Sequence, residues 1–367
     1  MDTIIGIDIG FGFTKVTDGK RFEVFKSIYG EAIDFQFKES LLHQNAEQDE
    51  HIQIDLDDAS YFVGELAERQ SSNRQFTLDQ TQFVATSTKI LALAAISRMM
   101  KTNQASFKVV VGLPIGHYRQ YKSELENMLR QSHKLGITNA KGERKEVVIG
   151  ISEVSVIPQP IGSVMDRLLN DVGKAADQRF AIEKIGVIDI GFRTSDYTIS
   201  DKARYSERGS LTTQNGISKA FEVIASKLKD SCGVNVELYR LFDAVESGSI
   251  KIRGKGFDLR KITQVAFQQL AANIAADANR IWNDDWDMDA IMITGGGGSV
   301  LATYLQPLLE GVIIPIEQDL DYRLHNVRGY HKYGCNRWAA IASPAPSAKQ
   351  PISEDSATDE NATKDHT

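Results

Sequence analysis

The apolar residues of this chain fall into two kinds of pattern that alternate along its length. Short continuous runs rich in Val and Ile predict buried strands, whereas apolar residues repeated every three or four positions predict helices. Strands are expected at residues 3–9, 107–113, 147–157 and 290–294, with a strand pair over 185–199. Helices are expected at residues 88–100, 118–134, 161–170, 218–230 and 263–282. This alternation predicts an α/β fold built on buried sheets.

Turn residues refine this picture at both ends of the chain. Near the start, residues 4–16 precede Asp18-Gly19 and a further strand-like run at 21–25, which predicts a β-hairpin followed by another strand. Near the end, a predicted strand leads into four glycines at 295–298, and a helix is expected from there through Leu309.

Composition limits the classes of protein to which the chain can belong. Its 367 residues, of which 42% are hydrophobic and 25% charged, are ordinary for a globular protein of two domains. The formal net charge of −7 gives no basic surface, so no direct binding to nucleic acid or to an anionic membrane is expected. Residues 344–367 are rich in Ser, Ala, Asp and Glu, and a disordered acidic tail is expected there.

Three further features predict a cytoplasmic protein. The first residues show no signal peptide, and no apolar run approaches the roughly 20 residues that a membrane helix needs. The two cysteines, Cys232 and Cys335, have no metal-ligand or CxxC spacing. Neither the histidines nor any serine or cysteine forms a pattern typical of covalent catalysis.

An internal repeat carries the most information about function. The pentapeptide Ile7-Asp8-Ile9-Gly10-Phe11 recurs letter for letter as Ile188-Asp189-Ile190-Gly191-Phe192. Each copy ends a predicted strand and enters a short polar turn, so the chain is expected to contain two related domains with equivalent hairpins.

The residues of these turns are suited to bind phosphate. Glycine lets backbone N–H groups approach a phosphate closely, and an aspartate beside the turn can hold the water ligands of Mg²⁺. The first candidate set is Asp8, Gly10, Phe11, Gly12 and Lys15, and the second is Asp189, Gly191, Thr194 and Asp196. Asp8 and Asp189 are the candidate Mg²⁺ ligands, acting through water.

Other interpretations of these turns are weaker. A single Asp-x-Gly turn is more often an ordinary hairpin, but the duplication favours phosphate binding. A dinucleotide-binding GxGxxG motif would need a glycine where Lys15 stands and a helix where the chain continues as a strand. In the glycine run, Gly295, Gly296 and Gly297 allow the backbone to approach a flat ring; a flexible linker is the alternative, but a buried strand and an amphipathic helix flank the run.

With these motifs, the chain resembles the actin-like ATPase superfamily, and most closely the plasmid-segregation actins of the ParM or StbA type and a related archaeal group. Asp8 to Lys15 match the phosphate-1 motif, Asp189 to Asp196 match phosphate-2, and Gly295 to Gly297 match the adenosine motif. Further likeness lies in residues 111–114, 158–159, 193–196 and 326–330. The resemblance spans most of residues 1–343.

The resemblance implies two ribonuclease-H-like domains, residues 1–160 with 326–343 and residues 161–325, with ATP or GTP and Mg²⁺ in the cleft between them. It implies that the chain assembles with itself into filaments that fall apart after hydrolysis, with an adaptor protein bound to DNA as a further partner. It also places the base or ribose beside the helix at 218–230, where Gly216 and Lys227 are candidates. The segment 31–58 differs most among such proteins, so filament geometry is not carried over.

For the chemistry, Gln159 is the expected positioner of the attacking water. Asp189 would help to polarise that water, and Lys15 would hold the β- and γ-phosphates. Asp196 either belongs to this phosphate-binding set or has only a structural role. Two other functions remain open: a small-molecule kinase on the same fold, which would need an acceptor pocket, and a nucleotide-binding adaptor without turnover.

Overall fold

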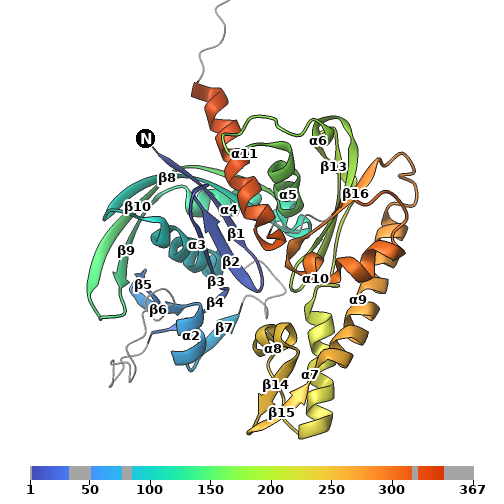
Figure 1. Ribbon diagram of the computed structural model, residues 1–367. Coiled ribbons are helices and arrows are strands. Elements are labelled where there is room, and N and C mark those ends of the chain that lie inside the picture. Colours follow the sequence, from blue (N-terminus) through green and yellow to red (C-terminus); the bar gives the residue numbers. More distant parts are fainter. Residues whose placement is uncertain (1, 33–50, 77–84, 316–320, 343–367) are drawn as a thin grey trace, which may run out of the picture.

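The computed structural model describes residues 2–32, 51–76, 85–315 and 321–342, which form two mixed sheets with helices around and between them (Figure 1). The first sheet contains β1 (Thr3–Ile9), β2 (Phe13–Thr17), β3 (Phe22–Lys26), β4 (Ile28–Glu31), β5 (Ile52–Leu56), β6 (Ala59–Val63), β7 (Arg74–Phe76), β8 (Gln104–Leu113), β9 (Ser132–Thr138) and β10 (Arg144–Pro158). The second contains β11 (Lys184–Ile190), β12 (Ser195–Asp201), β13 (Arg204–Thr213) and β16 (Ala290–Thr294), and a separate hairpin is formed by β14 (Ser249–Ile252) and β15 (Lys255–Asp258).

The α-helices are α2 (Glu65–Gln70), α3 (Ala85–Met99), α4 (Ile115–Leu129), α5 (Gln159–Leu168), α6 (Arg179–Ile182), α7 (Ser218–Cys232), α8 (Phe242–Ser247), α9 (Arg260–Ile281), α10 (Gly295–Leu305) and α11 (His325–Ala342). Short 3₁₀ turns are η2 (Leu238–Leu241), η3 (Gln306–Leu308) and η4 (Tyr322–Leu324). None of the helices in the described ranges is long and apolar enough to cross a membrane.

The two sheets repeat one arrangement of strands around β1 and β11. The strand order is β3-β2-β1-β8-β10-β9-β5-β6-β4-β7 in the first sheet and β13-β12-β11-β16 in the second. β1 pairs antiparallel with β2 and parallel with β8, and β11 likewise pairs antiparallel with β12 and parallel with β16. The repeated pentapeptide therefore stands at the carboxyl end of the equivalent strand in each sheet.

Side-chain alternation along β1 explains how helices cover both faces of the first sheet. Ile5 and Ile7 are fully buried in the cluster that contains the apolar side chains of α3. Gly6 points the other way, where an added Cβ would lie 2.5 Å from the carbonyl oxygen of Val327 in α11. Because successive residues of a strand face opposite sides, α3 and α11 cover opposite faces.

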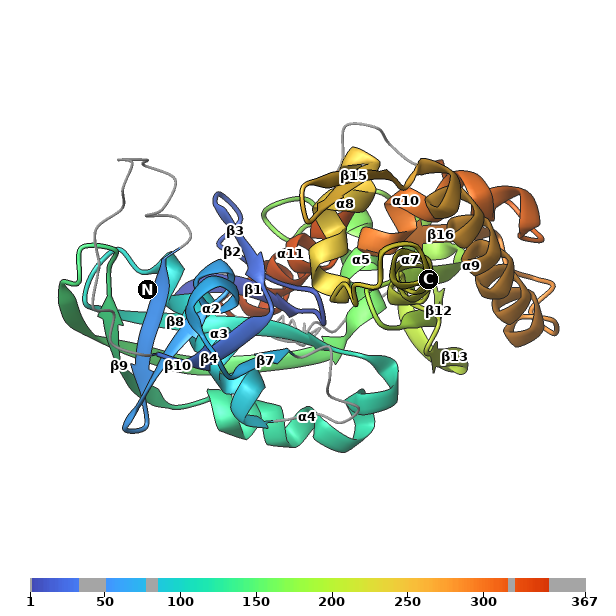
Figure 2. The same ribbon diagram turned by 90° about the horizontal axis from the view of Figure 1, so that it is seen from below.

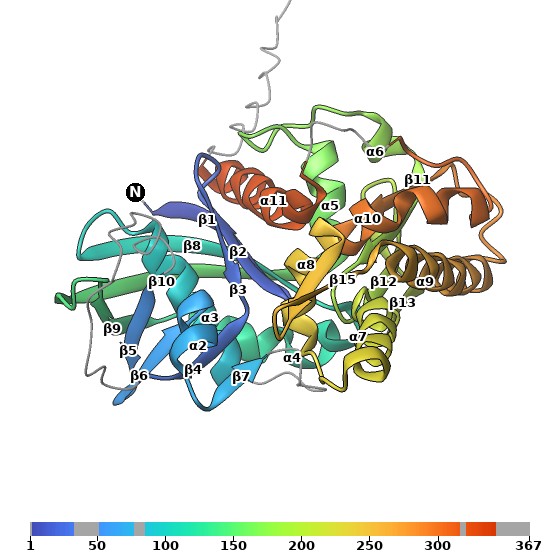
Figure 3. The same cartoon turned by 60° about the horizontal axis from the view of Figure 1, so that its bottom comes forward.

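α5 and α11 form the layer that joins the two sheets. One buried cluster combines Val110 of the first sheet, Val187 and Met292 of the second, and Tyr330 of α11. Figures 2 and 3 both show the two helices side by side between the sheets. Their backbones touch, because a Cβ on Gly329 would lie 1.7 Å from the carbonyl oxygen of Gly162.

The structure confirms the α/β class, the predicted strands of both sheets and the predicted helices that pack on them. The helix expected at 118–134 was too long: α4 ends at Leu129, and Ser132 begins β9, where it pairs with Gly150 of β10. The strands expected within 147–157 are one strand, β10, with a register shift between Ile151 and Glu153.

The glycine run also differs from its prediction. It was expected to lie before a helix, but α10 begins at Gly295, so the four glycines form its first turn. The division into residues 1–160 with 326–343 and residues 161–325 stays a prediction. The acidic tail expected at 344–367 lies outside the described residues, as does most of the variable segment at 31–58.

Candidate functional site

The two repeated hairpins have the same backbone geometry. The N–H of Gly10 donates to the carbonyl of Phe13 at 3.1 Å, and the N–H of Gly191 donates to that of Thr194 at 2.9 Å. Across each hairpin the aspartate faces a different partner, Lys15 opposite Asp8 and Asp196 opposite Asp189. The duplicated turn thus presents a cation in one copy and a second carboxylate in the other.

The tips of the hairpins meet. A Cβ added to Gly12 would lie 3.5 Å from Cβ of Phe192, and the guanidinium of Arg193 stands 5.8 Å from the ring centre of Phe11. Residues from far apart in the sequence are therefore brought to one place.

The loop carbonyls are already hydrogen-bonded, so the loops can offer N–H groups to a ligand. Ser27 donates from Oγ to the carbonyl of Gly10 at 2.6 Å and from its N–H to that of Gly12 at 3.0 Å. In the second loop, the N–H groups of residues 216–218 at the start of α7 donate to the carbonyls of residues 191–193. Within the described ranges, the N–H groups of Gly12 and Phe192 have no hydrogen-bond acceptor. Such N–H groups are the donors that a phosphate oxygen takes.

Both oxygens of the buried Asp8 carboxylate are held by side chains. Lys15 Nζ lies 2.7 Å from Oδ2, and the side-chain amide of Gln159 donates to Oδ1 at 3.3 Å. Gln159 is the first residue of α5, directly after β10, and its carbonyl accepts from the Tyr330 hydroxyl at 3.3 Å. The predicted phosphate lysine and the predicted water positioner therefore contact the same aspartate.

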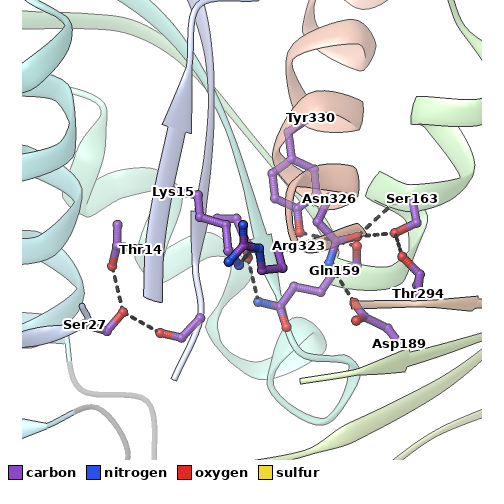
Figure 4. A network of polar contacts seen from close by, with 12 residues as sticks. Thr14, Lys15, Ser27, Gln159, Ser163, Asp189, Thr294, Arg323, Asn326 and Tyr330 are labelled. Atoms are coloured by element: carbon purple, nitrogen blue, oxygen red, sulfur yellow. Dashed lines mark hydrogen bonds and ion pairs between the residues drawn. The ribbon is translucent and has the colours of Figure 1, made fainter. Parts of the chain in front are cut away.

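Asp189 is held by a second network that begins in α11 (Figure 4). Asn326 donates from its side-chain amide to Oδ2 of Asp189 at 2.6 Å. The oxygen of that amide accepts from Ser163, from its N–H at 3.1 Å and from Oγ at 2.7 Å. Ser163 Oγ also lies 2.9 Å from the Thr294 hydroxyl, which links α5, α11 and the end of β16.

Burial sets the protonation of the second carboxylate pair. Burial, together with the charges of Asp196 and Asp8, raises the pKa of Asp189 to about 7, although the Asn326 hydrogen bond and Lys15 lower it. Burial likewise raises the pKa of Asp196 to about 6, against hydrogen bonds from Thr212, the Ile115 N–H and Thr194. A cation bound beside these two buried carboxyl groups would favour their ionised forms.

Comparison with known proteins leads to a family. Residues 6–162 match the model of the N-terminal domain of actin-like proteins, and residues 187–307 match that of the C-terminal domain of archaeal MreB-like actin homologues. The chain belongs to the actin-like proteins.

Solved structures show the same actin-like fold. A non-polymerisable quadruple mutant of the pCBH ParM protein is 25% identical with a TM-score of 0.74, covering 91% of this chain and 99% of that one. The ParM filament of 15 strands from Clostridium botulinum is 24% identical, with the same TM-score and coverage. The archaeal actin homologue Ta0583 in complex with ADP is 18% identical with a TM-score of 0.71, covering 93% of this chain and all of that one. A search of curated proteins gives no match.

In this actin-like protein the glycine run closes against the second hairpin. Gly295 has a φ of +83°, and a Cβ there would lie 2.3 Å from Oδ1 of Asp189. Gly297 packs against Ile190, where a Cβ would lie 2.6 Å from Cγ2. Gly296 faces outward, with Cγ of Arg323 3.6 Å from the position of its Cβ. The run therefore brings its backbone to the carboxylate and leaves one glycine open beside an arginine.

The two candidates near α7 lie in different surroundings. Gly216 lies against the second hairpin, where its N–H donates to the carbonyl of Arg193 at 3.0 Å. Lys227 lines a pocket of about 430 Å³ between α7 and α9, and none of the candidate phosphate residues lines it. The structure thus joins Gly216 to the second hairpin and places Lys227 in a pocket that Asn215, next to Gly216, also lines. Their predicted contact with a base or ribose stays a prediction.

The sequence did not single out four residues that the fold brings to this site. Asn326 donates to Asp189, and Ser163, which also contacts Thr294, holds the amide of Asn326. Arg323, ion-paired with Asp321 at 2.8 Å, stands beside Gly296. Asn326 was noted only as part of the family resemblance at 326–330. No local pattern could reveal its role, because its partner is 137 positions away.

Proposed function

We propose that this protein is a Mg²⁺-dependent nucleoside triphosphatase that binds ATP, or GTP, between its two hairpins. The observation that carries the proposal is the meeting of two matched hairpins, each with an ordered glycine turn and a buried aspartate. A triphosphate supplies the anionic oxygens that loop N–H groups and the Lys15 ammonium would bind.

Asp8 and Asp189 would hold Mg²⁺ through its water ligands. Carboxylate oxygens and water are the ligands that Mg²⁺ prefers, and the bound cation would neutralise charge on the transferring phosphoryl group. Within the described residues no group of three or more His, Cys, Asp or Glu side chains could bind a metal directly. The raised pKa of Asp189 fits this role, because a cation would favour the ionised form.

Gln159 would position the attacking water. Its carbonyl accepts from the Tyr330 hydroxyl and its side-chain amide donates to Asp8, so a neutral donor stands beside a proposed Mg²⁺ ligand. An amide orients water without taking its proton, and Asp189 would polarise it. For contact with the ribose or base of the nucleotide, Gly216 and Gly295 to Gly297 remain the candidates. Arg323, beside Gly296, is a better candidate for this contact than Lys227.

The same proposal includes self-assembly into filaments in the cytoplasm. It is supported by the likeness to the ParM protein whose 15-stranded filament has been solved. The proposal keeps the further partner that the family resemblance implies, an adaptor protein bound to DNA. It assigns the filament a role in plasmid segregation or in another form of cytoskeletal positioning.

Light scattering and phosphate release, recorded together after addition of ATP-Mg²⁺ or GTP-Mg²⁺, test the proposal. We expect scattering to rise and phosphate release to follow, and both to be absent in Asp189→Ala. Asp201→Ala, which removes an exposed carboxylate of the adjacent strand β12, is the matched control and should behave as wild type. Turnover without scattering would remove the filament from the proposal and favour a kinase; nucleotide binding without turnover would favour an adaptor.

A further inference from the structure

Trp286 is an unusual surface residue. It lies in the loop between α9 and β16 with 90% of its side chain exposed, more than any other large hydrophobic side chain in the described part of the chain. Tryptophan combines large apolar area with few rotatable bonds, and it is enriched among the residues that dominate protein interfaces. Its position therefore indicates a contact that forms with another molecule.

The loop that carries Trp286 is rigid and acidic. The nearly buried Asp285 carboxylate accepts from Lys184 Nζ at 2.9 Å and from Arg208 at 2.5 Å. Lys184 Nζ also lies 2.5 Å from Asp287. Four aspartates, at positions 284, 285, 287 and 289, thus stand against two cations and leave two negative charges around the tryptophan. A preorganised loop loses little entropy on binding.

The β14–β15 hairpin, at the other end of α9, is basic. β14 and β15 form a hairpin whose two-residue turn, Arg253-Gly254, has positive φ at both positions. Lys251, Arg253 and Lys255 are exposed on it, and none has an ion-pair partner among the described residues. The nearest carboxylate along the chain, Asp258, is already paired with Arg260. The hairpin therefore presents three uncompensated positive charges.

Helix α9 separates these two surfaces. It begins directly after β15 and ends directly before the Trp286 loop, and its 22 residues span about 33 Å (Figure 1). One molecule cannot bring its own two surfaces together across that length. The hairpin of one copy and the loop of another can meet, and the arginine and lysine heads of the hairpin can then lie against the indole face.

We propose that the Trp286 loop of one copy docks on the β14–β15 hairpin of the next copy. The two patches differ, so the contact is heterologous and leaves one patch of each kind unused at the two ends of a pair. Repeating it yields an open chain along the direction of α9. This inference rests on the proposed self-assembly and names the surfaces that carry it.

Two blocked variants test the contact, each with a matched control. Trp286→Ala removes the aromatic side chain, and Arg253→Glu/Lys255→Glu replaces two positive charges of the hairpin with negative ones. Val172→Ala is the control for the first, and Lys141→Glu/Lys145→Glu, with the same change of charge on the exposed β9–β10 hairpin, is the control for the second. We expect both blocked variants to raise the critical concentration about tenfold or more, the effect of losing an interface hot spot. Both controls should assemble as wild type, and all four should bind nucleotide normally.

A zero-length carbodiimide cross-link on assembled wild-type protein identifies the contact independently of mutation. It joins a carboxylate directly to an amine, so peptides containing Asp284 or Asp287 should be linked to peptides containing Lys251 or Lys255. If wild type assembles while the blocked variants assemble equally well and these links are missing, the docking proposal is wrong and the filament proposal stands. If wild type binds nucleotide but does not assemble, the docking proposal and the filament proposal are both wrong.

Discussion

Asn326 of α11 donates a 2.6 Å hydrogen bond to Asp189, a carboxylate at the end of the central strand of the second sheet. α11 itself packs on the first sheet through Gly6. The residue that orients a proposed Mg²⁺ ligand of one sheet is therefore fixed to the other sheet, so the relative position of the two sheets sets the geometry of the carboxylate.

Replacing Asn326 with aspartate tests this dependence. The change keeps the acceptors for Ser163 but removes the donor to Asp189 and adds a second carboxyl group beside it. A hydrogen bond to a charged group contributes about 2 kcal/mol, so affinity for Mg²⁺-nucleotide should fall by about 30-fold. Titration calorimetry measures it, with Asn336→Asp on the same helix as control. Unchanged affinity would show that Asn326 does not orient the ligand.

Replacing Gln159 with alanine should separate binding from hydrolysis. Its amide contacts Asp8 but the loops that would bind phosphate remain intact, so nucleotide affinity should stay within a few fold of wild type. Phosphate release should fall by about 100-fold, as when one oriented donor is removed from a reaction site. Filaments should then persist after ATP addition, which scattering records over time. A loss of affinity equal to the loss of turnover would contradict a role in positioning water.

The pKa of Asp189 predicts how stability depends on pH. Burial and the adjacent carboxylates raise it to about 7, against about 3.9 in an unfolded chain. Between these values the native state binds the proton that the unfolded chain has lost, so stability from this group is present at low pH and is lost as pH rises through about 7.

Thermal unfolding without nucleotide or Mg²⁺ measures this effect. Asp189→Asn should gain melting temperature relative to wild type as the pH is raised from about 5 to about 8, because only wild type acquires a buried charge. Asp201→Asn should show no such trend. A difference that does not change with pH would mean that Asp189 is ionised throughout.

The contact between α5 and α11 predicts a strongly destabilising substitution. In Gly329→Ala the new Cβ would lie 1.7 Å from the carbonyl oxygen of Gly162, a backbone atom that cannot move aside. The free energy of unfolding should fall by about 3 kcal/mol or more, the upper range for overpacking. Urea denaturation measures it. Gly150→Ala, whose Cβ would meet its nearest atom at 3.7 Å, is the matched control and should change stability little.

The sequence predicted the parts of this protein that have a local signal. The pentapeptide repeat located β1 and β11, the equivalent strands of the two sheets, and Asp8, Lys15 and Gln159 were all named before the fold brought them into contact. It did not predict β14 and β15, because strands of four residues carry too little periodicity. It extended α4 through residues 130–134 because the pairing that makes them a strand comes from β10. Asn326 and Ser163 lacked any signal, since their roles arise only when α5, α11 and β11 come together.

The glycine contact between α5 and α11 restricts how the two sheets can move relative to each other. With backbone against backbone, the helices cannot slide by one turn, because the neighbouring positions carry side chains that do not fit the gap. Tyr330, fully buried beside Gly112 and Gly162, blocks the same movement from within. We expect the two sheets to rotate about this contact. A small displacement at Asp189, close to the contact, would then become larger at the β14–β15 hairpin and the Trp286 loop, which lie farther away.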